Sequence, residues 1–461
     1  MVNDNVKYLT YMSNRSSIDS NQCQERLRAI RPMNSHSSSL QPAGQITAGF
    51  LNTDWNPRDV PPGTQTTNVV LRTADQAATG GSLYRPATPT DTVVCVMHPR
   101  EFMACHYLIP DIVSAGFAAW SQSPRSVGND LRLEHELALH DVAAGLQYLK
   151  SAGFKRIVLL GNSGGAGLYA LYVQQAALPG AQRIARTPGG RPTQLAELDM
   201  PSVDGFVLVG PHPGQGALLL NCIDPSVIDE NDPLSVDPSL DPLSPANGYA
   251  GRGETRYDAA FVERYRAAQR ARVARLDELA RSLIARRQAA RARVKEAAAG
   301  GGKGKPEDRR LAGHTPIFNV WRTDADLRCF DLTLDASDRK FGSLWGADPY
   351  ASNYGAVGFA RQCTPESWLS TWSALSSNAS LAKTAAAITQ PVLVIEYTGD
   401  QACFPGDVKR IVDAIASPTK RHLRVRGDHH GRALSADEEP GRLEAGRLLA
   451  QWLHAQFPPA A

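Results

Sequence analysis

Several features that mark special classes of protein are missing from this sequence of 461 residues. No stretch reaches the roughly 18 to 20 consecutive apolar residues of a membrane-spanning helix. The N-terminus has no basic start followed by an apolar run, so we expect no secretory signal. The formal net charge is only +3, which gives no general attraction to nucleic acid or to an anionic membrane. We therefore expect neither nucleic acid nor a membrane as a partner.

Cysteine is sparse, and its spacing is not that of a metal site. The number of cysteines is odd, and no two of them form a C-x-x-C pair. The seven positions are Cys23, Cys95, Cys105, Cys222, Cys329, Cys363 and Cys403. The simplest interpretation is a reduced, cytoplasmic protein without a bound metal.

The rest of the composition is that of an ordinary globular protein, with 42% hydrophobic and 21% charged residues. The length predicts one large domain with a substantial insertion, or two domains. Residues 1–45 are polar and rich in Ser, Asn and Gln. We interpret them as a mobile N-terminal arm.

Short β-branched runs alternate with helical patterns at both ends of the chain, and this alternation predicts an α/β fold. We expect a mostly parallel central sheet flanked by helices, formed by residues 46–211 and 386–461. The first two strands are predicted to form a hairpin around the Gly80-Gly81 pair. The predicted strands are 66–74, 82–87, 91–99, 116–122, 155–161, 204–210, 390–399 and 420–427, and the predicted helices are 133–152, 168–177, 407–416 and 442–457.

Residues 212–385 have a different composition and are predicted to be a mainly helical cap or lid. An Arg/Ala-rich helix is expected at 257–299. Its surplus of arginine suggests nucleic-acid binding, but no basic motif interleaved with aromatics supports that, and a solvated amphipathic helix is the better interpretation. Aromatic residues of this segment either line an apolar pocket or pack its core: Trp345, Tyr350, Tyr354, Phe359, Trp368 and Trp372.

A Gly-Asn-Ser-Gly-Gly turn carries the strongest chemical signal. Ser163 lies at its centre, directly after the apolar run RIVLL and directly before a helical pattern. That strand-turn-helix setting is the one in which G-x-S-x-G presents a nucleophilic serine. A phosphate-binding turn is the alternative, but the spacing G-x-x-x-x-G-K-[ST] is absent and this is not the first βα unit. We therefore predict that Ser163 is a nucleophile.

A serine nucleophile needs a base and an acid, and both occur after the last two predicted strands. Asp400 follows one strand, and His429 follows the next in GDHHG. The carboxyl ends of parallel strands lie along one edge of a sheet, where sites form. His430 is a rival base that spacing alone does not separate from His429. Asp407 and Glu396 are alternative acids in less suitable positions.

The motifs GNSGG, DQACFP and GDHHG, in the order serine, acid, histidine, resemble those of the α/β-hydrolase superfamily, most closely bacterial members with GNSGG at the nucleophile turn. The resemblance covers roughly residues 65–212 and 386–458. It implies a central sheet with a cap inserted between the sixth and seventh strands, which matches the 212–385 insertion.

The resemblance also implies an oxyanion hole. One backbone donor is expected from Gly164, just after the nucleophile, and the other from the loop after the third strand. That loop begins at His98, and the proline after it has no N–H, so Arg100 is expected to donate, or Glu101 if the loop is shifted. His98 is expected to shape this loop. His212, which follows the strand predicted at 204–210, is expected at the edge of the site, either as an ordinary turn residue or in contact with the substrate.

Together these observations predict a capped serine hydrolase that cleaves a carboxylic ester or related acyl bond of an enclosed small organic substrate. The partner is then a small-molecule acyl substrate, and no cofactor is needed. The same triad also suits an acyltransferase, a thioesterase or a carbon-carbon bond hydrolase. A non-catalytic binding protein of the same fold is the alternative from another class.

Overall fold

The structure is a computed structural model that describes residues 59–128, 130–356 and 358–458. The predicted arm at residues 1–45 lies outside this part of the chain. Within it, no helix is both long and apolar enough to cross a bilayer.

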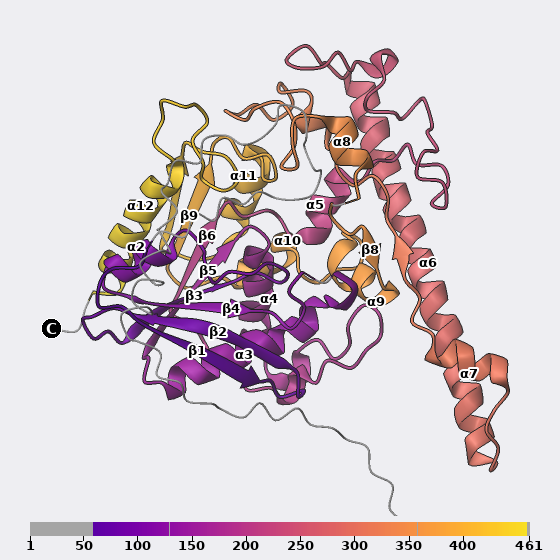
Figure 1. The fold of residues 1–461 in the computed structure, drawn as a ribbon, viewed down its shortest axis with the longest axis horizontal. Coiled ribbons are helices and arrows are strands. Elements are labelled where there is room, and N and C mark those ends of the chain that lie inside the picture. The colour runs from indigo at the N-terminus through magenta and orange to yellow at the C-terminus, as the bar shows by residue number, and fades with distance from the viewer. Residues whose placement is uncertain (1–58, 129, 357, 459–461) are drawn as a thin grey trace, which may run out of the picture. The chain divides into compact units, whose positions relative to one another are not determined.

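A mixed sheet of eight strands forms the centre of the described chain, in the order β1-β2-β4-β3-β5-β6-β9-β10 (Figure 1). The pairs β1-β2 and β2-β4 are antiparallel and all the others are parallel. The predicted mostly parallel sheet is therefore confirmed. The strands are β1 (Gln65–Arg72), β2 (Ala78–Arg85), β3 (Thr92–Met97), β4 (Ala118–Ser123), β5 (Arg156–Asn162), β6 (Gly205–Val209), β9 (Val392–Tyr397) and β10 (Lys420–Val425).

The prediction that Gly80-Gly81 makes the first hairpin turn is wrong. Both glycines lie within β2, and the chain reverses earlier, where Thr73 accepts the N–H of Gln76. A Cβ on Gly80 would lie 2.4 Å from the Val69 carbonyl oxygen, too close for any real side chain. The glycines therefore allow close approach of neighbouring strands.

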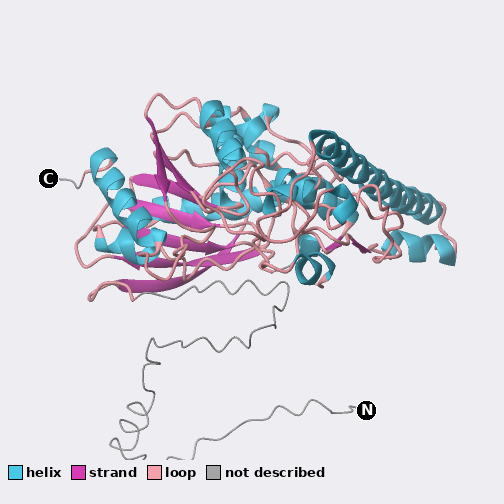
Figure 2. Ribbon diagram, turned by 90° about the horizontal axis from the view of Figure 1, so that it is seen from above, coloured by secondary structure: helices cyan, strands magenta, loops and turns pink. Residues whose placement is uncertain are grey.

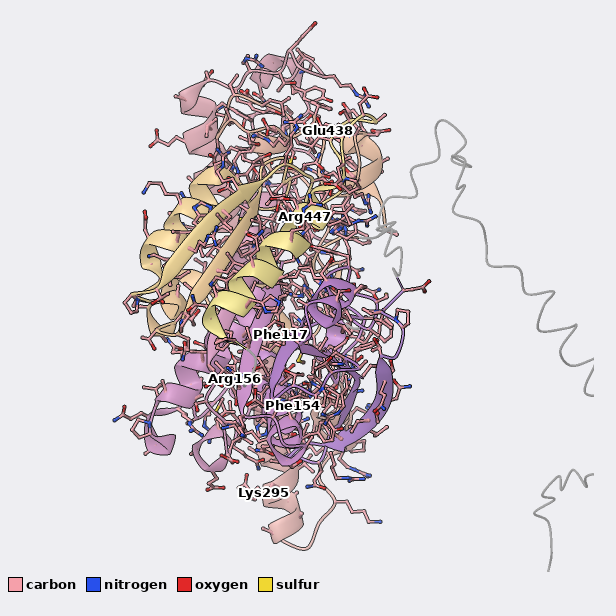
Figure 3. The ribbon with its side chains drawn as sticks, turned by 90° about the vertical axis from the view of Figure 1, so that its left-hand side faces the viewer. Phe117, Phe154, Arg156, Lys295, Glu438 and Arg447 are labelled. Atoms are coloured by element: carbon pink, nitrogen blue, oxygen red, sulfur yellow. The ribbon has the colours of Figure 1, made fainter. Side chains whose placement is uncertain are left out.

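Helices cover both faces of the sheet, and alternate side chains of each central strand point to opposite faces. On β3, Val93 and Cys95 pack toward one face and Val94 and Val96 toward the other. In Figure 3, α12 lies in front of the sheet, with Arg447 toward its outer side. The helices packed on the first face are α3 (His135–Ser151), α4 (Gly165–Ala177) and α11 (Pro405–Ala414), and those on the second are α2 (Ile109–Ser114) and α12 (Gly441–Gln456).

The chain between β6 and β9 contains several helices, one two-stranded sheet and long loops. All described residues nevertheless belong to one compact unit, so the boundaries of a cap at 212 and 385 stay a prediction. The elements are α5 (Gln215–Cys222), α6 (Ala259–Ala299), α7 (Pro306–Gly313), β7 (Phe318–Asn319), α8 (Pro349–Tyr354), β8 (Gln362–Cys363), α9 (Pro365–Ser367), the π-helix η6 (Trp368–Trp372) and α10 (Leu381–Thr384), with 3-10 turns η4 (Pro245–Asn247), η5 (Leu327–Cys329) and η7 (Ala385–Ala387). Further 3-10 turns elsewhere are η1 (Asp130–Arg132), η2 (Gly180–Gln182) and η3 (Leu195–Glu197).

The Arg/Ala-rich helix α6 is amphipathic, as predicted. Figure 2 shows it as a single long rod. Asp258 caps its first turn by accepting the Phe261 N–H at 2.7 Å. Its buried residues recur every three or four positions, which is one face of a helix: Phe261, Tyr265, Gln269, Arg272, Val273, Leu276, Asp277, Ala280, Ile284, Arg287 and Ala290.

A buried carboxylate joins α3 to η6 and to the segment that follows it. Glu136 is fully buried and accepts hydrogen bonds from Ser370 Oγ at 2.6 Å and Asn378 Nδ2 at 2.8 Å. Burial raises the pKa of this carboxyl group, while the two donors act to lower it. Thr371 adds a further bond to the Leu133 carbonyl at 2.8 Å. The inserted segment is thus fastened to the core by buried polar contacts.

Candidate active site

The turn after β5 holds Ser163 in a conformation that few side chains adopt. Its φ is +52°, which lies in the left-handed region and costs about 1–3 kcal/mol for a residue other than glycine. A Cβ on Gly161 would lie 2.6 Å from Ala166 Cα, and one on Gly165 would lie 2.3 Å from the Met97 carbonyl oxygen. The flanking glycines therefore allow β5, the turn and α4 to meet this closely.

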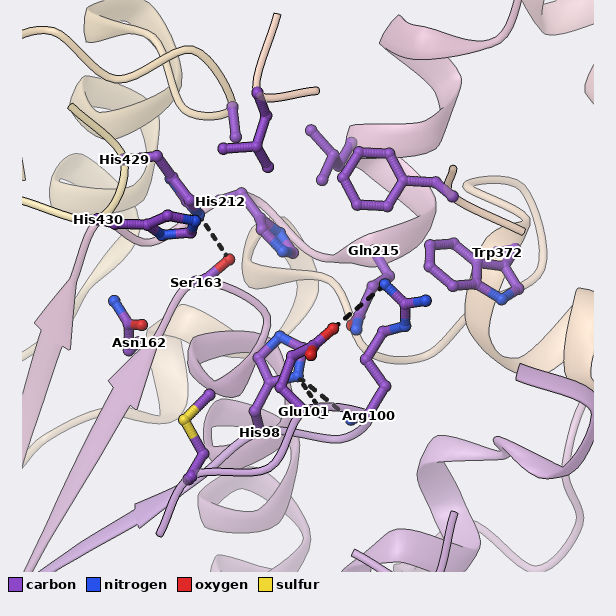
Figure 4. Close-up of a pocket in the computed structure, with 15 residues that line it drawn as sticks. His98, Arg100, Glu101, Asn162, Ser163, His212, Gln215, Trp372, His429 and His430 are labelled. Carbon is purple, nitrogen blue, oxygen red and sulfur yellow. Dashed lines mark hydrogen bonds and ion pairs between the residues drawn. The ribbon is translucent and has the colours of Figure 1, made fainter. Parts of the chain in front are cut away.

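A continuous set of hydrogen bonds links the serine to two downstream residues (Figure 4). Ser163 Oγ lies 2.9 Å from His429 Nε2. His429 Nδ1 lies 2.8 and 2.9 Å from the two carboxylate oxygens of Asp400. Asp400 also accepts the backbone N–H groups of Ala402 at 2.7 Å and Cys403 at 2.9 Å. The structure thus brings together the three residues that the sequence analysis selected.

The environment of His429 favours its protonated form. Burial alone lowers the pKa of the imidazole, but the charge of Asp400 and the hydrogen bond to it act in the opposite direction, and the pKa is raised above 6.5. The rival His430 has a pKa well below 6.5, because burial and repulsion by His429 disfavour its cation. Only His429 is hydrogen-bonded to Ser163 Oγ among the described histidines.

The alternative acids lie in other ion pairs. Glu396 bonds His422 Nε2 at 2.8 Å and Arg424 at 3.1 Å. Asp407, at the start of α11, pairs with Arg328 at 2.9 Å. The structure therefore connects neither of them to His429.

The loop after β3 folds around His98. The imidazole Nδ1 accepts the N–H of Arg100 at 3.2 Å and the N–H of Glu101 at 3.0 Å. His98 is thus placed under this loop. The Arg100 side chain pairs with Asp130 at 2.9 Å. Because the Arg100 N–H is already engaged, its role as second oxyanion donor stays a prediction.

The loop between β6 and α5 brings His212 and Gln215 to the same place. His212 Nδ1 accepts the Gly214 N–H at 3.2 Å, and burial, with repulsion by nearby histidines, lowers the pKa of His212 to about 3. Gln215 Oε1 lies 3.0 Å from His135 Nε2. Both His212 and Gln215 line the space in front of Ser163.

That space is a small, mostly apolar cavity of about 50 Å³. Core loops and the inserted segment both contribute to it. Of the aromatics singled out in the sequence, Phe359 and Trp372 line this cavity, whereas Tyr350 is exposed. The lining residues are His98, Arg100, Glu101, Met103, Asn162, Ser163, His212, Gln215, Leu218, Leu344, Phe359, Trp372, Ala402, His429 and His430.

Sequence reasoning did not select Gln215 or His135. Gln215 follows the sixth predicted strand, three residues after His212, and residues that follow parallel strands meet at one edge of the sheet. That position is a usable signal. His135 lies in a helix with no comparable signal, and only the tertiary fold brings it to Gln215.

The described residues contain no group of three or more His, Cys, Asp or Glu side chains placed to hold a metal ion. The six cysteines in the described residues are free thiols.

Comparisons with known proteins give structural likenesses only. No family model and no curated protein sequence matches this chain. Among solved structures, DcsB in complex with its substrate analogue is 14% identical, with a TM-score of 0.45, covering 85% of this chain and 100% of that one. The esterase domain of a Rhodothermus marinus protein is 10% identical, with a TM-score of 0.39, covering 85% and 98%. Est1E from Butyrivibrio proteoclasticus is 10% identical, with a TM-score of 0.40 and the same coverage.

The topology itself identifies the fold. One antiparallel hairpin leads into a parallel sheet, and the strained serine follows β5 at the start of α4. The residues bonded to that serine come later in the chain, in the order Asp400 and then His429. This arrangement is the one that the sequence resemblance predicted. The chain therefore has the α/β-hydrolase fold.

Proposed function

We propose that the protein is a serine hydrolase that cleaves a carboxylic ester of a small organic substrate through an acyl-enzyme. One observation carries the proposal: the hydrogen-bonded series from Asp400 through His429 to Ser163 ends at a small, largely apolar cavity. A serine hydroxyl is a weak nucleophile until a positioned base takes its proton, and this geometry provides that base.

The reaction then has two halves. His429 Nε2 takes the proton of Ser163 as Oγ attacks the ester carbonyl, and Asp400 stabilises the imidazolium that forms. The imidazolium returns the proton to the departing alcohol, and the acyl group stays on Oγ. Water, activated by the same imidazole, attacks the acyl-enzyme and releases the carboxylic acid. Donors near Gly164 stabilise the oxyanion in both halves.

The nucleophile is tested with a fluorophosphonate probe, which transfers its phosphonyl group to a reactive serine and releases fluoride. We expect stoichiometric labelling of the wild type and none of Ser163→Ala. Ser202→Ala, at an exposed serine, is the matched control and should label normally. Equal labelling of the wild type and Ser163→Ala, or no labelling of either, contradicts the proposal and favours a binding protein of the same fold.

The base is tested by comparing two neighbouring variants on p-nitrophenyl acetate. His429→Gln is expected to lower kcat by roughly 10³-fold or more, because the proton acceptor is lost. His430→Gln should keep most of the activity. The reverse pattern would assign the base to His430. A panel of esters, thioesters and amides, with and without an added alcohol acceptor, then separates ester hydrolysis from the other acyl reactions of this triad.

A further inference from the structure

The oxyanion hole lacks an obvious second backbone donor. In the loop after β3, the two N–H groups available near the turn belong to Arg100 and Glu101, and both donate to His98 Nδ1. If either of them turned to a substrate, it would give up its hydrogen bond to the buried His98 imidazole, at a net cost of about 0.5–1.5 kcal/mol. A donor that has no hydrogen-bond partner in this structure can bind the oxyanion without giving up another hydrogen bond.

Gln215 provides such a donor. The residue is only 2% exposed, and its Nε2 is buried without a hydrogen-bond partner. A Cβ built on Gly164 would lie 2.9 Å from this nitrogen, so the amide group lies directly beside the residue that follows the nucleophile. The amide also belongs to the lining of the catalytic cavity, as Figure 4 shows.

His135 holds the amide in this orientation. Its Nε2 lies 3.0 Å from Gln215 Oε1, so the protonated nitrogen donates to the amide oxygen and leaves the NH₂ group directed toward Gly164. The backbone N–H of His135 is itself fixed by Ser370 Oγ at 2.9 Å. The donor is therefore preorganised, which is the condition for electrostatic stabilisation of a transition state.

We propose that the side-chain amide of Gln215 is the second oxyanion donor and acts together with the backbone N–H of Gly164. This inference rests on the proposed function of Ser163. When Oγ bonds to the carbonyl carbon, the carbonyl π electrons move to oxygen, and that oxyanion accepts one hydrogen bond from Gln215 Nε2. The amide NH₂, which has no partner in the free protein, forms a stronger hydrogen bond with the charged oxyanion than with the neutral carbonyl oxygen of the substrate. It therefore stabilises the transition state more than the bound substrate.

The test uses two substitutions of Gln215. Gln215→Glu keeps an oxygen acceptor for His135 but replaces the donor with a negatively charged oxygen, and Gln215→Met removes the donor without adding charge. We expect kcat/KM for p-nitrophenyl acetate to fall by about 10²- to 10³-fold in each, with the loss mainly in kcat. An aryl trifluoromethyl ketone, which forms an alkoxide on Ser163, should lose affinity by a similar factor.

The matched control is Gln175→Glu. Gln175 is equally buried at 3% exposure, and its Oε1 accepts the Ile184 N–H at 2.8 Å, but it does not line the cavity. This variant should keep full activity. Thermal melts of all variants show whether each protein is folded. If Gln215→Glu does not fold, Gln215→Met alone provides the test.

The outcomes separate the two proposals. If a folded Gln215 variant keeps kcat/KM and ketone affinity within about threefold of the wild type while Ser163→Ala is inactive, the amide is not the donor and the serine mechanism stands. A fall in activity with unchanged ketone affinity assigns Gln215 a role in cavity structure and overturns the inference. If the wild type does not react at Ser163, the proposed function fails, and the inference fails with it.

Discussion

At the scale of single residues, Gly164 is the glycine whose substitution would disturb side chains of the site directly. Its missing side chain leaves room for two nitrogens, because a Cβ would lie 2.6 Å from His98 Nε2 and 2.9 Å from Gln215 Nε2. His98 is a buried ring that holds a loop, so it has little freedom to retreat. A methyl group here must displace either the loop or the amide.

We therefore expect Gly164→Ala to lower kcat/KM by about 10- to 100-fold and to destabilise the fold by about 1–3 kcal/mol, because the added carbon overpacks the turn. Gly313→Ala, where a Cβ meets nothing within 4 Å, is the control and should change neither quantity. Steady-state kinetics and urea unfolding measure both. Full activity in Gly164→Ala would show that His98 and Gln215 can move without cost.

The pH dependence of activity follows from the pair His429 and Asp400. The base must be neutral to accept the serine proton, and the pKa of His429 is raised above 6.5. Activity should therefore fall as the pH drops through a value above 6.5. In Asp400→Asn the attraction for the imidazolium is lost and burial dominates, so the acidic limb of kcat/KM should move to lower pH while the plateau falls by about 10³- to 10⁴-fold. An acidic limb that stays in place would assign it to another group.

Ser163, Asp400 and His429 could be predicted because each follows a segment whose sequence pattern indicates a strand. The carboxyl ends of parallel strands lie along one edge of the sheet, so residues that follow them meet there. The choice between His429 and His430 could not be predicted. The two residues are adjacent, so both lie at a suitable distance in sequence from Ser163 and Asp400, and only the conformation of the loop decides which side chain faces the serine. The hydrogen bond from the Arg100 N–H to His98 Nδ1 could not be predicted either, because no sequence pattern shows that the imidazole turns back onto the loop.

At the scale of elements, strands and helices of the core follow their sequence patterns closely, since buried parallel strands are apolar on both faces. Gly80-Gly81 shows where local signals fail. Glycine pairs are common in turns, but here glycine is needed because the backbones of β1 and β4 lie too close for a side chain. A Cβ on Gly81 would lie only 2.3 Å from the Ser121 carbonyl oxygen. Tertiary contact, which is absent from a local pattern, decides such positions.

The link between α3 and the inserted segment yields a stability prediction. Asn378→Ala removes one of two side-chain donors to the buried Glu136 carboxylate, which should cost about 1–3 kcal/mol. Because burial raises the pKa of Glu136 in the folded protein and the donors lower it, losing one donor raises it further. The folded state then binds the proton more tightly than the unfolded state does, so the cost should be larger at about pH 8 than at about pH 5.

Urea unfolding at the two pH values measures this difference. Asn68→Ala, at an exposed asparagine whose Oδ1 accepts a hydrogen bond from Ser82 Oγ, should show a small change that does not depend on pH. A cost for Asn378→Ala that is the same at both pH values would mean that Glu136 does not change protonation on unfolding in this range.

At the scale of the whole molecule, the cavity is shared between the sheet loops and the inserted segment. Met103 comes from the core, and Leu218, Leu344, Phe359 and Trp372 come from the chain between β6 and β9. The sequence predicted an insertion over the serine, but not which of its apolar residues reach the site. Apolar periodicity marks burial and does not distinguish a pocket wall from a core.

The preference for acyl chains of different length tests whether the apolar residues that line the cavity contact the acyl group of the substrate. Leu344 is only partly buried, so Leu344→Ala should enlarge the cavity at a modest cost in stability. We expect the ratio of kcat/KM for p-nitrophenyl butyrate to that for the acetate to rise by about tenfold, in line with the energy of one or two methylene groups. Leu279→Ala, at an exposed leucine of α6, should leave the ratio unchanged. An unchanged ratio in Leu344→Ala would place the acyl chain elsewhere.

The buried carboxylate on α3 also limits how this protein can be recombined with other proteins of the same fold. A chimera that exchanged residues 212–385 for the corresponding segment of such a protein would lose Ser370 and Asn378 together. Glu136 would then stay buried without these two donors, which is costly for a charged group. We therefore expect exchange of the segment alone to destabilise the fold unless the new segment places donors at the same two positions. Core and insertion must be exchanged or selected as one unit.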